Sequence, residues 1–245
     1  MLKEAIEKIA ALSAPFVSEI EGKAFILAKD SADYKQVQPD FEFPKTLELY
    51  SLEALVQMLK TEAAEVFDAP FYVNAHAHDE VICYTRPLDA LRNERAKLYL
   101  VRAKDVPGWD KDVQLSYEEA MIAIRTRFQE TQDTEYLLRL LSEITCGASV
   151  KYANNGIATT IVTKHGVDLQ SNAPIKPIVK LKPYRTFQEI DQPESEIHIR
   201  VKEQGIKFIE ADGGMWKLAA RHTIAEHLKE ALADMIEAGN VIVTI

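Results

Sequence analysis

Two histidines one residue apart form the strongest metal-ligand pattern in this chain, within the segment His76-Ala77-His78-Asp79-Glu80. On a β-strand, residues i and i+2 face the same way, so both imidazoles could meet one metal ion beside a carboxylate. The other interpretation is a polar turn between two strands, with the histidines exposed. Because two histidines leave a metal ion short of ligands, the sequence favours the turn, and we predict neither a metal nor a cofactor.

The remaining histidine patterns also fall short of a metal site. The same segment resembles the His-x-His-x-Asp-His cluster of metallo-β-lactamase-type hydrolases, but Glu80 stands where that cluster has aspartate and Val81 where it has histidine. His222 and His227 are five residues apart on a predicted helix. That spacing puts them on different faces, unlike the i, i+4 pair of a helical zinc site, so we expect solvated helix residues.

The sequence holds no motif for a nucleophile or a phosphate loop. Neither Cys83 nor Cys146 has an adjacent histidine motif, and the patterns GxSxG, GxxxxGK[ST] and GxGxxG are absent. The segment 212–214, Asp-Gly-Gly, is typical of a tight turn in which glycine supplies positive φ, with Trp216 after it as a core or interface anchor. No carboxylate pair is singled out by its spacing. We therefore predict no catalytic residue, while an acid–base site built from distant residues stays open.

A run of basic residues is the best candidate for binding. Lys176, Lys180, Lys182 and Arg185 have no acidic residue between them. Lys180 and Lys182 share a face of a predicted strand, and with Arg185 they could grip a phosphate, a nucleotide or an acidic partner. Two structural interpretations stand beside this one: lysines on an edge strand prevent aggregation, or they pair with nearby acids within or between subunits. Those acids are Glu189, Asp191, Glu194 and Glu196.

The composition is that of a soluble globular protein. The 245 residues are 47% hydrophobic and 27% charged, which permits one large core or two smaller ones. A net charge of −9 opposes binding to nucleic acid and to anionic membranes. Two cysteines exclude a disulfide framework. Residues 1–14 lack the apolar core of a signal peptide, and no apolar run reaches the roughly 18 residues of a membrane span, so we expect a soluble, cytosolic protein.

The hydrophobic pattern mixes strands and helices without regular βαβ alternation. This predicts an α+β fold, a mixed and largely antiparallel sheet with amphipathic helices packed on it. Helices are expected over 2–12 and 223–238, and after caps at Ser51, Ser116 and Asp133. Strands are expected over 16–20, 23–28, 46–50, 71–73, 81–84, 97–102, 150–153, 158–163, 178–187, 196–201 and 241–245. We predict one domain over 1–245, with a linker at 104–113 and a sub-domain boundary near 104–115.

Three short segments carry a resemblance to a known family. They are Tyr184-Arg-Thr-Phe187, Gln192-Pro-Glu-Ser195 and Glu210-Ala-Asp-Gly-Gly-x-Trp216. With them the chain resembles the YfdQ-like family of uncharacterised proteins from tailed phages and prophages, most strongly over about 159–232. The resemblance implies a phage or prophage gene expressed in bacterial cytoplasm. It transfers no catalytic residue, because that family has no assigned active site.

Three hypotheses of function follow. The first is a non-enzymatic phage accessory protein that assembles as a homo-oligomer and binds an unknown phage or host protein. The second is a metal-dependent enzyme of phage nucleotide or nucleic-acid metabolism that uses His76, His78 and Asp79. The third is a host-defence inhibitor that sequesters a nucleotide or a host protein, with Lys180, Lys182 and Arg185 as its candidate contacts. We expect neither a membrane nor nucleic acid as partner.

Overall fold

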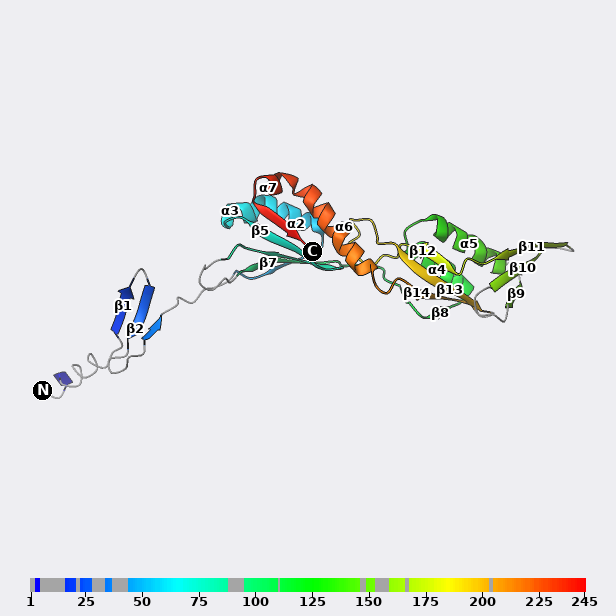
Figure 1. Cartoon of the computed structure of the whole chain (residues 1–245), viewed down its shortest axis with the longest axis horizontal. Coiled ribbons are helices and arrows are strands. Elements are labelled where there is room, and N and C mark those ends of the chain that lie inside the picture. Colours follow the sequence, from blue (N-terminus) through cyan, green and yellow to red (C-terminus); the bar gives the residue numbers. More distant parts are fainter. Residues whose placement is uncertain are drawn as a thin grey trace. The chain divides into compact units, whose positions relative to one another are not determined.

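The computed structural model describes residues 3–4, 16–20, 23–27, 34–36, 44–87, 95–109, 111–145, 149–152, 159–165, 168–202 and 205–245. The chain forms two compact units, residues 1–43 and 44–245 (Figure 1). In the first unit, β1 (Phe16–Ile20), β2 (Lys23–Leu27) and β3 (Tyr34–Gln36) form an antiparallel sheet, so the hairpin predicted there is confirmed. Apart from residues 3–4, the predicted helix 2–12 lies outside the described residues.

The second unit begins with a five-stranded sheet in the order β15-β5-β6-β7-β4. Its outer strands run parallel to their neighbours, whereas the central strands are antiparallel. The strands are β4 (Leu47–Leu49), β5 (Phe71–Ala77), β6 (Glu80–Tyr84), β7 (Lys97–Arg102) and β15 (Val241–Thr244). The parallel pairs need long connections, and these connections contain further strands as well as helices.

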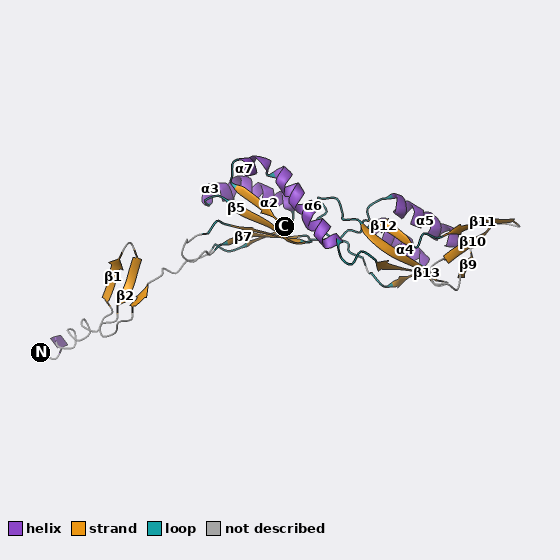
Figure 2. Ribbon diagram, viewed as in Figure 1, coloured by secondary structure: helices purple, strands orange, loops and turns teal. Residues whose placement is uncertain are grey.

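Helices pack on this sheet and bury its first hydrophobic core (Figure 2). Ser51 accepts a hydrogen bond from the backbone N–H of Ala54 at 3.1 Å, as the predicted cap requires. The chain continues through a π-helical turn into a further short helix. The elements are α2 (Leu52–Met58), η1 (Leu59–Ala63), α3 (Ala64–Val66), α6 (Trp216–Ala231) and α7 (Ala233–Glu237). Gly239, with φ +73°, ends α7 as predicted.

A four-stranded antiparallel sheet, β12-β13-β14-β8, carries the second core. Its strands are β8 (Gln114–Leu115), β12 (Ile178–Leu181), β13 (Ser195–Lys202) and β14 (Gly205–Glu210). Alternate residues of β13 are buried against α4 (Tyr117–Arg127) and α5 (Gln132–Thr145). A third sheet, β11-β10-β9, contains β9 (Ser149–Tyr152), β10 (Thr159–His165) and β11 (Asp168–Pro174), which includes the second predicted hairpin.

The predicted α+β class, with a largely antiparallel sheet and helices packed on it, is therefore confirmed. The segment 103–113 connects the first core to the second. The division of the chain into domains, with one domain over 1–245, stays a prediction. Within the described ranges, none of the helices has both the length and the apolar character needed to traverse a lipid bilayer.

Four local predictions are wrong. Asp133 does not cap α5, because the helix begins one residue earlier and Thr131 and Thr134 bond reciprocally at its start. The strand predicted over 178–187 ends at Leu181, and the last helix begins at Trp216 rather than near 223. Finally, the turn predicted at 74–80 is shorter, because β5 continues to Ala77 and β6 starts at Glu80.

Residues 182–194, which we call the junction loop, connect the two cores. The loop joins β12 to β13 of the second sheet, yet its Phe187 and Ile190 are buried in the first core. Its Glu189 accepts hydrogen bonds from the backbone N–H groups of Leu52 and Glu53, both at 3.1 Å, at the N-terminus of α2. A carboxylate at this position is favourable because helix N-termini carry partial positive charge and unpaired N–H groups.

We predict that Gly205→Ala destabilises the protein strongly. Gly205 has φ +145°, and a Cβ atom there would lie 1.9 Å from the carbonyl oxygen of Leu115. We expect the free energy of unfolding, measured by urea denaturation, to fall by about 3 kcal/mol or more. In the control Gly213→Ala, at φ +62°, no atom lies within 4 Å of the added Cβ, and a loss of only about 1–2 kcal/mol is expected. Equal losses in the two variants would contradict the close approach to Leu115.

Candidate binding pocket

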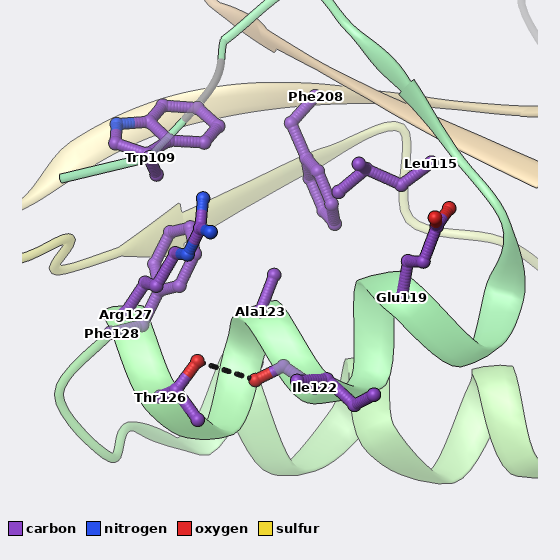
Figure 3. A pocket seen from close by; sticks show the side chains of 9 residues that line it. All are labelled: Trp109, Leu115, Glu119, Ile122, Ala123, Thr126, Arg127, Phe128 and Phe208. Atoms are coloured by element: carbon purple, nitrogen blue, oxygen red, sulfur yellow. Dashed lines mark hydrogen bonds between the residues drawn. The ribbon is translucent and has the colours of Figure 1, made fainter. Parts of the chain in front are cut away.

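A pocket of about 240 Å³ lies between α4 and the second sheet (Figure 3). Glu119, Ala123 and Arg127 are spaced at i, i+4 and i+8, so they follow one another along a single face of α4. Figure 3 shows the small side chain of Ala123 at the base of this space, with Trp109 and Phe208 across from it. The pocket exists because the helix presents an alanine where a larger residue would reach the sheet. Its other lining residues are Leu115, Ile122, Thr126 and Phe128.

Three aromatic rings form one wall of the pocket. The ring centroids of Trp109 and Phe128 are 5.3 Å apart at an interplanar angle of 66°, and those of Trp109 and Phe208 are 6.2 Å apart at 69°. Edge-to-face geometry of this kind is favourable between aromatic rings. Because Phe128 and Phe208 are buried in the second core, they hold Trp109 in place although it lies in an irregular segment.

The polar groups that line the pocket are already engaged. The Glu119 carboxylate accepts hydrogen bonds from the Ser116 backbone N–H at 2.9 Å and from its hydroxyl at 2.8 Å, which confirms the predicted capping box. These two bonds hold the pKa of Glu119 below its usual range, so the carboxylate is ionised at neutral pH. The Thr126 hydroxyl donates to the Ile122 carbonyl oxygen at 2.8 Å within the helix.

This lining suits binding better than reaction. Its lining carries one hydroxyl and one carboxylate, those of Thr126 and Glu119, and both are engaged in hydrogen bonds within α4 and its N-cap rather than with each other. Pockets for whole small-molecule ligands usually measure about 300–1,000 Å³. A space of about 240 Å³ with aromatic walls matches one ring-sized apolar group instead.

The basic residues predicted to bind an anion each meet a different carboxylate. Their edge-strand position is confirmed for Lys180, because β12 is the outer strand of its sheet. The ion pairs are Lys176–Asp133 at 3.3 Å, Lys180–Glu194 at 3.3 Å, Lys182–Asp191 at 2.6 Å and Arg185–Glu210 at 2.7 Å. This arrangement fits the two structural interpretations made from the sequence, which are ion pairing within one subunit and protection of an edge strand. A role of Lys180, Lys182 and Arg185 in binding an anion or partner stays a prediction.

Arg185 differs from the lysines because its charge is buried in the junction loop. Its side chain is only 7% exposed, and its guanidinium donates to Glu210 and to the Ser195 hydroxyl. That hydroxyl in turn donates to Asp212 at 2.5 Å. The guanidinium also lies 3.8 Å from the centroid of the Trp216 ring, at the start of α6. Arg185 thus ties the second sheet to a helix of the first core through charge and cation–π attraction.

Both charges of this network persist at neutral pH. Burial lowers the pKa of Arg185 to about 10, although Glu210 and Asp212 act in the opposite direction. Burial would raise the pKa of Asp212, but hydrogen bonds from Ser195 and the Gly214 backbone, with the charge of Arg185, hold it below its usual range. The turn before α6 is the predicted one, since Gly213 and Gly214 have φ +62° and +82°.

The two histidines of the candidate metal site have different surroundings. His76 is exposed near the end of β5, whereas His78 is half-buried with its ring edge-on to Trp216, at a centroid distance of 4.7 Å. The Nδ1 atom of His78 lies 3.6 Å from a carboxylate oxygen of Asp79. Among the residues that the structure describes, no three His, Cys, Asp or Glu side chains converge to hold a metal ion. Thus His78 packs at the junction instead of projecting from an exposed turn.

The cysteine and the other histidines bring no reactive group to either site. Cys83 is buried in the first core, where burial raises the pKa of its thiol to about 12. A thiol that stays protonated at neutral pH is a poor nucleophile. His222 is exposed and His227 half-buried on α6, while Cys146 lies outside the described residues.

Sequence reasoning missed the aromatic pocket. It assigned Trp109 to a linker and gave Phe128 and Phe208 no place in a site. The contact between these rings and Phe208 joins segments about 80–100 residues apart, which hydrophobic periodicity does not reveal. The one available signal was Ala123, a small residue between larger ones on the sheet-facing side of α4.

We predict that Arg185→Met lowers the free energy of unfolding by about 3–5 kcal/mol, because removing one member of a buried ion pair leaves the other charge uncompensated. The matched control is Lys180→Met, which breaks an ion pair whose lysine side chain is 59% exposed. An exposed pair contributes about 0–1 kcal/mol, so the control should remain close to wild type. Chemical denaturation of both variants measures the difference, and a small loss for Arg185→Met would contradict a structural role.

Stability should depend on the protonation of His78. Burial lowers its pKa from 6.5, with Lys217 and Arg185 acting in the same direction and Asp79 against it. The unfolded chain therefore protonates His78 more readily than the folded protein does. The neutral His78 side chain contributes fully to stability above pH 6.5, and this contribution is lost as the pH falls through the folded-state pKa.

In His78→Gln, we expect the free energy of unfolding to fall less steeply than in wild type between about pH 7 and pH 5. The exposed His222→Gln serves as the control and should retain the wild-type slope. Denaturant titrations across this pH range measure the slopes, and identical slopes for wild type and His78→Gln would refute the assignment.

The comparisons with known proteins assign this chain to no family. The resemblance to the YfdQ-like family, noted on three segments of the chain, accordingly stays a prediction. Neither protein-family models, curated proteins nor solved structures yielded a match to this chain.

Proposed function

We propose that this protein is a non-enzymatic phage or prophage accessory protein that acts by self-assembly and by binding a partner protein. The aromatic pocket over Ala123 takes an aromatic side chain that the partner presents. This pocket is the observation that carries the proposal. The phage origin rests only on the resemblance of segments such as 184–187 and 192–195 to the YfdQ-like family.

The size and walls of the pocket support an aromatic side chain as its occupant. A volume of about 240 Å³ accepts one ring, and the rings of Trp109 and Phe208 offer it edge-to-face contacts. Aromatic anchors that fill preformed pockets are the residues that contribute most to protein–protein affinity. Because Phe128 and Phe208 belong to the core, the pocket is formed before a partner arrives, which lowers the entropic cost of binding.

The state of the reactive groups supports binding over catalysis. Cys83 is a buried, protonated thiol, and the Arg185 guanidinium is committed to Glu210, Ser195 and Trp216. His78 packs against Trp216 at the same junction. Each of these groups therefore already has a structural role, whereas the space over Ala123 is open to a ligand group.

We predict that the side-chain fragments indole and p-cresol bind this pocket. The chain has two tryptophans, so protein labelled with 5-fluorotryptophan should give two ¹⁹F signals, which Trp216→Phe assigns. We expect the fragments to shift the Trp109 signal saturably and to leave the Trp216 signal unchanged. In Ala123→Met the longer side chain fills the base of the pocket, and the Trp109 shift should be lost.

The control for this experiment is Ala219→Met, which makes the same substitution at an exposed position on α6. It should bind the fragments like wild type, and thermal unfolding of both variants checks that the fold is retained. Absence of a saturable Trp109 shift in wild type, or its survival in Ala123→Met, would count decisively against the pocket as a binding site.

A further inference from the structure

The outer strand β15 leaves backbone hydrogen-bonding groups unused by its own sheet. It is the first strand in the order β15-β5-β6-β7-β4 and runs parallel to β5. The carbonyl of Asn240 accepts from the N–H of Phe71 at 2.8 Å, which fixes which residues face β5. The backbone N–H and C=O groups of successive residues point to opposite sides of a strand. Those of Val241 and Val243 therefore face away from β5. No described strand other than β5 pairs with β15, and of these two residues Val243 is half-buried and Val241 is 2% exposed.

β15 also lacks the features that usually protect an edge strand. Its sequence, Val-Ile-Val-Thr, has no charge and no proline. The outer strand β12 of the second sheet differs, because Pro177 precedes it and Lys180 lies within it. Natural proteins protect exposed edges with such residues, since an unprotected apolar edge recruits further strands. The contrast within one chain singles out β15 as an edge that accepts a partner strand.

An open groove of about 570 Å³ runs along β15 beside α7. Ala233 and Ile236 line its helical side, and Val241, Ile242 and Val243 its strand side. The side chain of Ile242 is 43% exposed. A strand added to β15 would cover this isoleucine and place its own side chains in the groove.

Two opposite charges flank the groove at its two ends. Glu237 lies at the end of α7, just before the turn into β15, and Lys229 lies eight residues earlier on α6. The turn at Gly239 sends β15 back along these helices, so Glu237 is beside the start of the strand and Lys229 is toward its far end. Within the described residues, neither side chain forms an ion pair in its own chain.

We propose that the occupant of this edge is a second copy of the chain, paired through β15 in antiparallel orientation about a two-fold axis at Ile242. This inference deepens the self-assembly in the proposed function and rests on it. Val241 of one copy bonds to Val243 of the other, and the two Ile242 side chains lie opposite one another. The antiparallel arrangement brings the start of one strand beside the end of the other. Lys229 of each copy therefore faces Glu237 of its partner, so this ion pair occurs twice in the dimer.

The first arm of the test measures mass by sedimentation equilibrium and by size-exclusion chromatography with light scattering. We expect wild type to be a dimer or a higher even oligomer. Ile242→Lys places two like charges directly opposite at the axis and should raise the dissociation constant at least tenfold. The matched control is Ile178→Lys on β12, where the isoleucine is 49% exposed and also lies on an outer strand. It should assemble like wild type.

The second arm reverses the flanking charges. Lys229→Glu and Glu237→Lys each create two repulsive pairs and should weaken assembly, whereas the double variant restores attraction and should recover affinity to within about threefold of wild type. Both residues are exposed, so folding is not at risk, and circular dichroism verifies it.

The outcomes separate this interface from the proposed function. An oligomer unaffected by Ile242→Lys, or a double variant no better than the singles, would overturn the β15 interface and leave self-assembly through another surface. A wild-type monomer at every concentration would overturn both the interface and self-assembly. The ¹⁹F titration of Trp109 reports on partner binding independently of either result.

Discussion

The burial of one guanidinium between two cores constrains this structure more than any other contact. Arg185 lies in the junction loop between two strands of the second sheet, but it stacks on Trp216 at the start of a helix that packs on the first sheet. A charge that is 7% exposed needs compensation, which Glu210 and the Ser195–Asp212 pair provide at the two terminal nitrogens, whereas the buried Nε atom has no hydrogen-bond partner. The junction loop, the turn before α6 and the end of β14 must therefore adopt mutually consistent positions before the guanidinium can be buried.

The junction loop meets this constraint because one of its own side chains forms hydrogen bonds with the backbone of the loop. The buried amide of Gln192 accepts from the N–H groups of Arg185 and Thr186 and donates to the carbonyl oxygens of Phe187 and Ile190. A buried loop without such a residue would leave polar groups unpaired at considerable cost. The loop can consequently insert apolar side chains into the first core while both of its ends remain in the second sheet.

Local patterns predicted much of this fold, and contacts between distant segments explain what they did not predict. The capping box at Ser116 and Glu119, the strand 97–102 and the buried stripe of α2 follow from periodicity and end signals that act within a few residues. The strand predicted over 178–187 ends early because the following residues serve the junction, which overrides their local β-propensity. The aromatic pocket was not predictable for the same reason, since its walls come from α4, β8, β14 and the segment at Trp109, which converge only in the folded second core.

Glu189 has a further effect through its position at the N-terminus of α2. Opening of the junction loop would leave the N–H groups of Leu52 and Glu53 unpaired, and opening of the helix would deprive the Glu189 carboxylate of these two donors. Phe187 and Ile190 extend this dependence into the first core. Amide hydrogens in α2 and in the strands flanking the loop should therefore exchange with solvent through a shared opening event, and residues 44–245 behave as one cooperative unit although they contain two hydrophobic centres.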